Sequence, residues 1–234
     1  MTTPRARTGC RQTRFQPPTG STELLLIRHG ESAPAYPDEP FPLVNGQGDP
    51  ELAPAGRQQA ERVAERLRAE RIDAVYVTTL RRTAQTAAPL TARLGLTARV
   101  EPDLREVHLG SWEGGLLRKM MAERDPVAQQ MQAEERWDVI PGAEPAEEFA
   151  TRVRKAVQRL AGEHPDRRLA VFTHGGVIGQ VMALASGSRS FAFLGADNGS
   201  ISHIVVTGES WIVRCFNDTA HLGPAFGRSA TPLT

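Results

Sequence analysis

The chain lacks the features that define several classes of protein. Its 234 residues include only two cysteines, Cys10 and Cys215, so neither a disulfide framework nor a thiolate zinc site is indicated. No apolar run approaches the roughly 20 residues that a membrane span needs. With 28 basic and 27 acidic residues the net charge is +1, which gives no reason to expect a nucleic acid as partner. These absences leave an ordinary globular composition that can form one sizeable core.

The two ends of the chain differ from the middle. Residues 1–22 contain four arginines and no acidic residue, and they are rich in Thr, Pro and Gln. Such a segment cannot bury enough apolar surface to order itself, so we predict a disordered basic extension. It lacks the apolar segment of a secretory signal, which leaves an Arg-rich transit peptide as the alternative to a cytoplasmic location, the location that we expect. Residues 218–234 are predicted to be a loose tail.

Strand and helix patterns alternate between residues 23 and 217, which we interpret as one domain. Short apolar runs predict buried strands at 24–27, 74–77 and 169–172, and a brief strand that ends at Val100. Helical periodicity predicts helices at about 56–71, 82–94, 145–162 and 177–185. Thr78 and Thr79 are capping candidates for the second helix. The segments 201–206 and 211–216 resemble a terminal hairpin. The alternation predicts a three-layer α/β/α sandwich, its sheet mostly parallel with an antiparallel edge.

Two segments do not fit this alternation. Residues 33–55 hold many prolines and no clear period, so we expect a long loop that is either functional or mobile. Residues 114–140 have a helical pattern that Asp125 and Pro126 interrupt, and we expect a small helical cap there. Neither segment has a pattern that indicates a particular ligand.

Histidines follow two of the predicted strands directly. The first strand ends in Arg28-His29-Gly30, and a later one ends in Thr173-His174-Gly175-Gly176. Because the carboxyl ends of parallel strands meet at one edge of a sheet, we expect the two histidines to face each other, with Arg81 and Arg82 nearby. Guanidinium groups bind phosphate oxygens and a neutral imidazole can attack phosphorus, so the set favours a dianionic substrate. A metal site is disfavoured, since no His-x-x-x-His spacing or cysteine pair occurs and the arginines would repel a cation.

These residues belong to motifs that resemble those of the histidine phosphatase superfamily, which includes cofactor-dependent phosphoglycerate mutases and many phosphatases. The segment Leu26–Ser32 resembles the family's Arg-His-Gly signature, and Leu80–Ala87 resembles its Leu-x-Arg-x-x-Gln-Thr-Ala element. The resemblance also includes the start of the first helix (Asp49–Leu52, Gly56, Gln59 and Ala60), the acid segment (Leu104–Glu106, Gly110 and Trp112–Gly114) and the second histidine (Thr173–Gly176). It covers residues 23–216 in order and implies a phosphoglycerate mutase-like fold.

The resemblance implies a role for each matching residue. His29 would be the nucleophile that forms a phosphohistidine, and Arg28, Arg82 and His174 would bind the phosphoryl oxygens with it. Glu106 would protonate the leaving oxygen and then activate water, while Glu113, the alternative acid, is interpreted as structural support. The family element selects Arg82 over Arg81, which we interpret as a solvated neighbour. No metal or other cofactor is implied.

Departures from the family pattern concern the substrate. The phosphate-binding Asn of some members is replaced by Ala35, and Asn45 is a candidate substitute. The Arg and Tyr that hold the substrate carboxylate in the mutases are replaced by Val107 and Leu109. We therefore expect a phosphatase acting on small phosphomonoesters, with no nucleic-acid or membrane partner. A phosphoglycerate mutase and a catalytically idle binding module are the alternatives, and a homodimer is left open.

Overall fold

A six-stranded sheet forms the centre of the molecule. The computed structural model describes residues 11–36 and 38–223. Across the sheet the strands are β5 (Ala98–Val100), β4 (Ala74–Val77), β6 (Arg168–Thr173), β1 (Thr22–Arg28), β7 (Ile201–Thr207) and β8 (Ser210–Asp218). The first four are parallel, whereas β7 and β8 pair antiparallel to their neighbours. The predicted mostly parallel sheet with an antiparallel edge is confirmed.

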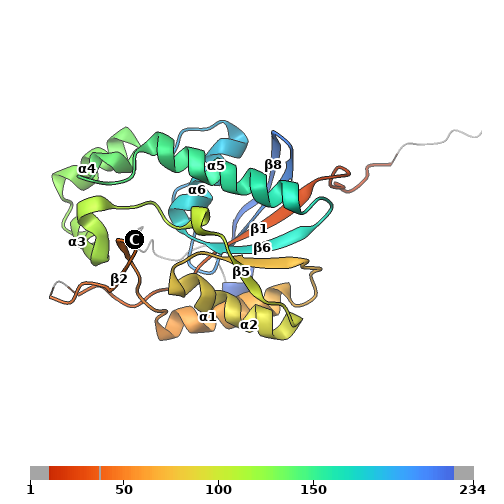
Figure 1. The fold of residues 1–234 in the computed structure, drawn as a ribbon, viewed down its shortest axis with the longest axis horizontal. Helices are drawn as coiled ribbons and strands as arrows, with labels where there is room; N and C mark the ends of the chain where they lie inside the picture. The colour runs from red at the N-terminus through yellow and green to blue at the C-terminus, as the bar shows by residue number, and fades with distance from the viewer. Residues whose placement is uncertain (1–10, 37, 224–234) are drawn as a thin grey trace, which may run out of the picture.

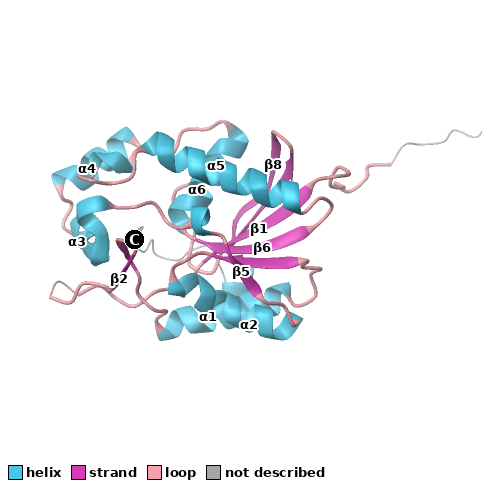
Figure 2. Cartoon of the chain, viewed as in Figure 1, coloured by secondary structure: helices cyan, strands magenta, loops and turns pink. Residues whose placement is uncertain are grey.

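Helices cover both faces of this sheet (Figures 1 and 2). One face packs against α1 (Pro54–Leu67) and α2 (Arg81–Leu94), and the other against α5 (Ala146–Glu163) and α6 (Gly175–Ser186). The alternation of β1 explains how one strand serves two cores: Leu24 and Leu26 face α5 and α6, while Leu25 and Ile27 face α1 and α2. This is the predicted three-layer sandwich.

The segment predicted as a helical cap lies beyond one end of the sheet (Figure 1). It contains the 3-10 helix η2 (Gly110–Gly115), α3 (Leu116–Ala122), α4 (Pro126–Glu134) and the 3-10 helix η3 (Trp137–Val139), with the break between α3 and α4 at Asp125-Pro126. Trp112, Ala128, Met131 and Ile140 form its own small core. The long proline-rich loop contains a short hairpin, β2 (Leu43–Val44) with β3 (Gln47–Gly48).

The ends of the fold differ somewhat from the predicted extension and tail. β1 begins at Thr22, and the Gly20 amide donates to the Asp166 carboxylate at 2.6 Å, so the last residues of the basic extension join the fold. After β8, the 3-10 helix η4 (Ala220–Leu222) buries Leu222, which extends the fold past the expected end. Residues 1–10 and 224–234, the remainder of the predicted extension and tail, lie outside the described residues.

The loop that follows β1 is in direct backbone contact with the start of α1. The Ala53 amide donates to the Glu31 carbonyl at 2.9 Å, and the Gly30 amide donates to Thr86 Oγ1 at 3.0 Å. A Cβ atom at Gly56 would collide with the backbone of Glu31, and one at Gly30 would collide with that of Gly56. Glycine at these two positions therefore allows the loop after His29 to pack directly against the backbone at the start of α1.

We expect Gly56→Ala to lower the free energy of unfolding by about 1–3 kcal/mol, because the added methyl group forces two backbone segments apart. The matched control is Gly162→Ala, also in a helix, where no atom outside the neighbouring helix backbone lies within 4 Å of the new methyl group. That change should raise stability by up to about 1 kcal/mol, since alanine favours a helix. Urea unfolding of both variants measures the difference. An undiminished stability of Gly56→Ala would contradict the close contact.

Candidate active site

Two buried histidines meet at the carboxyl ends of β1 and β6. His29 follows β1 and is 6% exposed, and His174 follows β6 and is completely buried. Their ring centroids lie 5.3 Å apart in an edge-to-face arrangement. The backbone amide of His29 donates to the Thr173 carbonyl at 3.0 Å, which continues the pairing of the two strands up to the histidines.

The hydrogen bonds of His29 define its tautomer. Its Nδ1 lies 2.7 Å from the carbonyl oxygen of Gly30, which can only accept, so Nδ1 carries the proton. Nε2 is then the nitrogen that retains a lone pair. Burial lowers the pKa of His29 well below its usual value of 6.5, and the charges of Arg82 and Arg28 lower it further. His29 is therefore neutral at pH 7.

His174 is held by Thr78, the residue that follows β4. Its Nε2 forms a 2.9 Å hydrogen bond with Thr78 Oγ1, and its buried Nδ1 has no partner among the described residues. Burial, and then the charge of Arg82, lowers the pKa of His174 well below 6.5. The prediction that Thr78 or Thr79 caps α2 is wrong, because α2 has Leu80 at its N-cap position with no side-chain cap.

Two arginines stand beside the histidines. Arg28 ends β1 and donates through Nη1 to the Ala196 carbonyl at 2.6 Å, and Arg82, only 7% exposed in the first turn of α2, donates through Nη1 to the Gly48 carbonyl at 2.9 Å. Burial lowers the pKa of Arg82 to about 10, while the nearby Glu106 opposes that shift. Both side chains stay cationic at neutral pH and can attract an anion.

Arg81 has a different function in the fold. Its backbone amide and Nε donate to the buried carboxylate of Asp49 at 2.7 and 3.0 Å. This pair fastens the start of α2 to the loop after β3, although the Arg81 side chain as a whole is 43% exposed. The two neighbouring arginines are thus separated, one beside the histidines and one in an ion pair.

Glu106 reaches the start of α6, two residues beyond His174, from the segment that follows the 3-10 helix η1 (Pro102–Leu104). Its carboxylate accepts from the amides of Gly176 at 3.1 Å and Val107 at 3.0 Å. A Cβ atom at Gly176 would lie 2.5 Å from Glu106 Oε1, so only glycine lets α6 begin this close to the carboxylate. The carboxylate is thereby placed beside the residues that follow His174.

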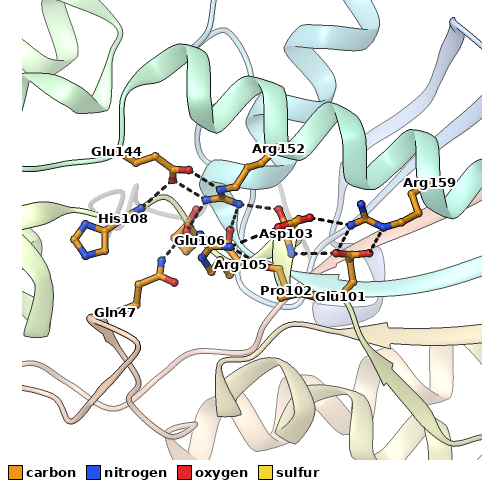
Figure 3. A network of polar contacts seen from close by, with 10 residues as sticks. All are labelled: Gln47, Glu101, Pro102, Asp103, Arg105, Glu106, His108, Glu144, Arg152 and Arg159. Carbon is orange, nitrogen blue, oxygen red and sulfur yellow. Dashed lines mark hydrogen bonds and ion pairs between the residues drawn. The ribbon is translucent and has the colours of Figure 1, made fainter.

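The main chain around Glu106 is held by one largely buried arginine of α5, Arg152, as Figure 3 shows. All five N–H groups of Arg152 are used: two donate to the Glu144 carboxylate at 2.6 and 2.7 Å, and three donate to the carbonyls of Asp103, Arg105 and Glu106 at 2.8, 2.8 and 2.9 Å. Arg152 therefore positions the segment that carries Glu106. Sequence reasoning did not identify it, because in the sequence it is one more polar residue of an amphipathic helix.

Gln47 supports the same segment from the opposite side. The buried side chain of Gln47, in β3, donates to the Glu106 carbonyl at 2.7 Å. Glu113 joins this hairpin to the cap, because its carboxylate accepts from the amides of Gly48 and Leu109 at 2.7 and 2.8 Å. Asn45 lies exposed at the tip of the hairpin with a φ of 50°, a left-handed conformation that asparagine tolerates and that a tight hairpin turn requires.

A third arginine comes from the cap. Arg118, in α3, donates to the Ala33 carbonyl at 2.7 Å and to Ser32 Oγ at 2.6 Å, in the loop just beyond His29. Burial is the main cause of the lowered pKa of His29, Arg28 and Arg82, and the charge of Arg118 lowers each of them a little further. Neither the sequence pattern nor the resemblance marked this residue, since residues 114–140 carry no ligand motif.

Two further observations concern metal binding and membrane spans. Among residues 11–36 and 38–223, no group of three or more His, Cys, Asp or Glu side chains is arranged to hold a metal ion. No helix in this part of the chain is both long and apolar enough to cross a membrane.

Comparison with known proteins gives a consistent result. The family model of the histidine phosphatase superfamily (branch 1) matches residues 24–219. Phosphoglycerate mutase-like protein 4 of Arabidopsis thaliana is 34% identical over 204 residues, covering 86% of each chain. The metal-independent phosphoserine phosphatase of the same plant is 31% identical over 206 residues, covering 86% of this chain and 83% of that protein.

A solved structure supports the same relationship. The native structure of mycobacterial glucosyl-3-phosphoglycerate phosphatase superposes with a TM-score of 0.70 at 29% identity, covering 85% of this chain and 100% of that one. The predicted family resemblance and the predicted fold are therefore both confirmed.

Because Arg152 positions the segment that carries Glu106, its replacement tests the role of Glu106. If Glu106 donates a proton to the leaving oxygen, Arg152→Gln should slow phosphate release from an alkyl phosphate about 10- to 100-fold, because the acid is misplaced. Release from p-nitrophenyl phosphate should fall less than about threefold, since p-nitrophenolate departs without a proton. Steady-state rates on both esters, with folding checked by circular dichroism, measure the split.

Arg159→Gln is the matched control, because Arg159 lies on the same helix but donates to the side chains of Glu101 and Asp103 (Figure 3). It should leave the ratio of the two rates unchanged. An equal loss on both esters in Arg152→Gln would show that the arginine supports folding and not the acid.

Proposed function

The chain belongs to the histidine phosphatase superfamily, and from this premise we propose that it hydrolyses small phosphomonoesters through a phosphohistidine at Nε2 of His29. The observation that carries the proposal is the state of His29: buried, neutral, and with its proton on Nδ1, so that Nε2 is free to attack. A neutral imidazole beside guanidinium groups combines a nucleophile with anion binding.

The reaction proceeds in two displacements. In the first, His29 Nε2 forms a bond to phosphorus while the ester P–O bond breaks, and the leaving oxygen takes a proton from Glu106. In the second, water attacks the phosphohistidine, gives its proton to Glu106 and releases inorganic phosphate, which regenerates His29. Arg28, Arg82 and the Nδ1 side of His174 bind the phosphoryl oxygens, and each well-placed donor contributes about 3–4 kcal/mol to the transition state. No step requires a metal ion.

Hydrolysis is favoured over phosphoglycerate mutase activity by the two positions after Glu106. Val107 is 2% exposed in the main core, and Leu109 packs against the same core and that of the cap. Apolar side chains that pack in this way cannot replace the polar pair that holds a carboxylate in the mutases. An idle binding module is disfavoured because the nucleophile, the acid and the basic residues are all present together.

The names of two relatives support a small phosphorylated substrate. By their names, they act on phosphoserine and on glucosyl-3-phosphoglycerate, which are small phosphorylated molecules. We propose a substrate of the same size range for this chain. A cytoplasmic location and the role of Asn45 stay predictions.

The proposal predicts that protein treated with excess EDTA still releases phosphate from p-nitrophenyl phosphate and, after alkaline quenching, carries a base-stable phosphoryl group on His29. Peptide mass spectrometry locates the group. His29→Gln should abolish labelling and lower the rate at least about 10³-fold, whereas His203→Gln, which changes a histidine paired with Glu23 at the other end of β1, should do neither.

Three outcomes would contradict the proposal. Phosphate on serine, aspartate or cysteine would exclude the phosphohistidine. Loss of activity with EDTA and recovery with Mg²⁺ would indicate metal-assisted hydrolysis. Conversion of 3-phosphoglycerate to 2-phosphoglycerate faster than phosphate release, with a trace of 2,3-bisphosphoglycerate present, would favour the mutase.

A further inference from the structure

Thr78 lies at the carboxyl end of β4, where its hydroxyl group contacts the second histidine of the site. β4 and β6 are parallel neighbours in the sheet, so the residue that follows β4 lies beside the end of β6 and His174. Thr78 is 3% exposed, and its Oγ1 lies 2.9 Å from Nε2 of the completely buried His174. Because neither group is in contact with bulk water, the partner of each polar atom is set by the protein or by a ligand.

The hydrogen bonds at the start of α2 indicate where the Thr78 hydroxyl proton points. Thr83 Oγ1 lies 2.8 Å from the Leu80 carbonyl oxygen and 3.5 Å from that of Thr78. A carbonyl oxygen only accepts, so the Thr83 hydroxyl donates there and not to the Thr78 hydroxyl. The Thr78 proton then has two acceptors within reach, Thr83 Oγ1 at 3.2 Å and His174 Nε2 at 2.9 Å.

His174 Nε2 is the better of these two acceptors. It is nearer, and Thr83 Oγ1 already accepts from the Thr78 backbone amide at 3.0 Å. Thr78 Oγ1 itself accepts from the Leu80 amide at 3.3 Å, so its remaining function is to donate. The hydroxyl group therefore donates to the imidazole and leaves the ring proton on the other nitrogen.

The other ring nitrogen is prepared for a ligand. Burial lowers the pKa of His174 well below 6.5, so the ring is neutral at pH 7 and carries a single N–H group. With Nε2 accepting, this group is at Nδ1, which is buried and has no partner among the described residues. A buried donor without an acceptor is unfavourable, and an anionic ligand supplies the missing acceptor.

We propose that Thr78 is a positioning residue, which holds His174 as the Nδ1–H tautomer so that Nδ1 donates to a phosphoryl oxygen of the substrate. In the opposite tautomer, the Nδ1 lone pair would repel that oxygen. A hydroxyl group fixes the tautomer without adding a charge, whereas a carboxylate at this position would favour the imidazolium ion. This inference rests on the proposed function, and it adds a residue that acts through His174.

The two histidines then carry their protons on the same ring nitrogen for different purposes. In His29 the Gly30 carbonyl holds the proton on Nδ1, which leaves the Nε2 lone pair for phosphorus. In His174 the Thr78 hydroxyl occupies Nε2, which leaves the Nδ1–H group for an oxygen. One ring is thus set as a nucleophile and the other as a donor, while both stay neutral.

The test removes the hydroxyl group and keeps the shape of the side chain. In Thr78→Val we expect ¹⁵N NMR at pH 8 to show His174 as a mixture of tautomers, with its signals assigned from His174→Gln. The value of kcat/KM for p-nitrophenyl phosphate should fall about 10-fold, less than the roughly 10²-fold loss on removing a donor, because the bound anion still favours Nδ1–H. Thr78→Ser restores the hydroxyl group and should recover both the tautomer and, within about threefold, kcat/KM.

Thr22→Val is the matched control. Thr22 is also a buried strand threonine, and its hydroxyl lies near the carbonyls of Ala161 and His164 at the opposite end of β1 from His29. The change should leave the His174 tautomer unchanged and kcat/KM within about twofold of wild type. A loss of rate equal to that of Thr78→Val would show that removal of any buried hydroxyl lowers activity through stability, and would overturn the inference.

The wild-type spectrum tests the tautomer without any variant. A proton on His174 Nε2 would overturn the inference, and the proposed function would stand if His29 is still phosphorylated. An unchanged Nδ1–H tautomer in Thr78→Val, or no recovery in Thr78→Ser, would show that the residue serves only packing. Protein that hydrolyses no phosphomonoester would contradict the proposed function and, with it, the role given to the Nδ1–H group.

Discussion

The site depends on keeping an imidazole neutral among guanidinium groups. A protonated His29 could not attack phosphorus, and its charge would add to those of Arg28, Arg82 and Arg118. Burial and these same cations lower the pKa of His29, so that the groups that attract the substrate also keep the nucleophile in its reactive form. Because the pKa of His29 in the folded state lies below its unfolded value of 6.5, the neutral buried ring makes its full contribution to folding stability above pH 6.5. Its contribution is lost as the pH falls below 6.5 towards the folded-state pKa.

Such a site requires a precise scaffold. The parallel strands bring His29 and His174 to one edge of the sheet, and the backbone contact between Gly30 and Gly56 leaves the His29 loop little freedom to move. Glu106 comes from an irregular segment, where precision is harder to obtain. Arg152 compensates by donating to three backbone carbonyls of that segment, and Gln47 donates to one of them from the other side. The chain thus uses hydrogen bonds where it lacks regular secondary structure.

Much of this could be predicted from the sequence, and what could not has a common physical reason. The strands and helices can be predicted from local periodicity. The two histidines come directly after predicted strands, so the fold and the pairing of His29 with His174 could both be predicted. Arg152, Gln47 and Arg118 act through contacts between segments far apart in the chain, with no periodic or motif signal. Thr78 was misassigned because a threonine before a helix is usually a cap, whereas here its hydroxyl bonds His174. Asn45 is explained locally by the hairpin turn that it occupies.

Whether His29 is neutral can be measured most directly by ¹⁵N NMR of the histidine rings between pH 8 and pH 5.5. Spectra of His29→Gln assign the signals. We predict that His29 remains a neutral Nδ1–H tautomer, with no titration as the pH passes 6.5, while an exposed histidine in a reference peptide titrates near that value. A titration midpoint of His29 at or above pH 6.5, or a proton on its Nε2, would contradict this prediction.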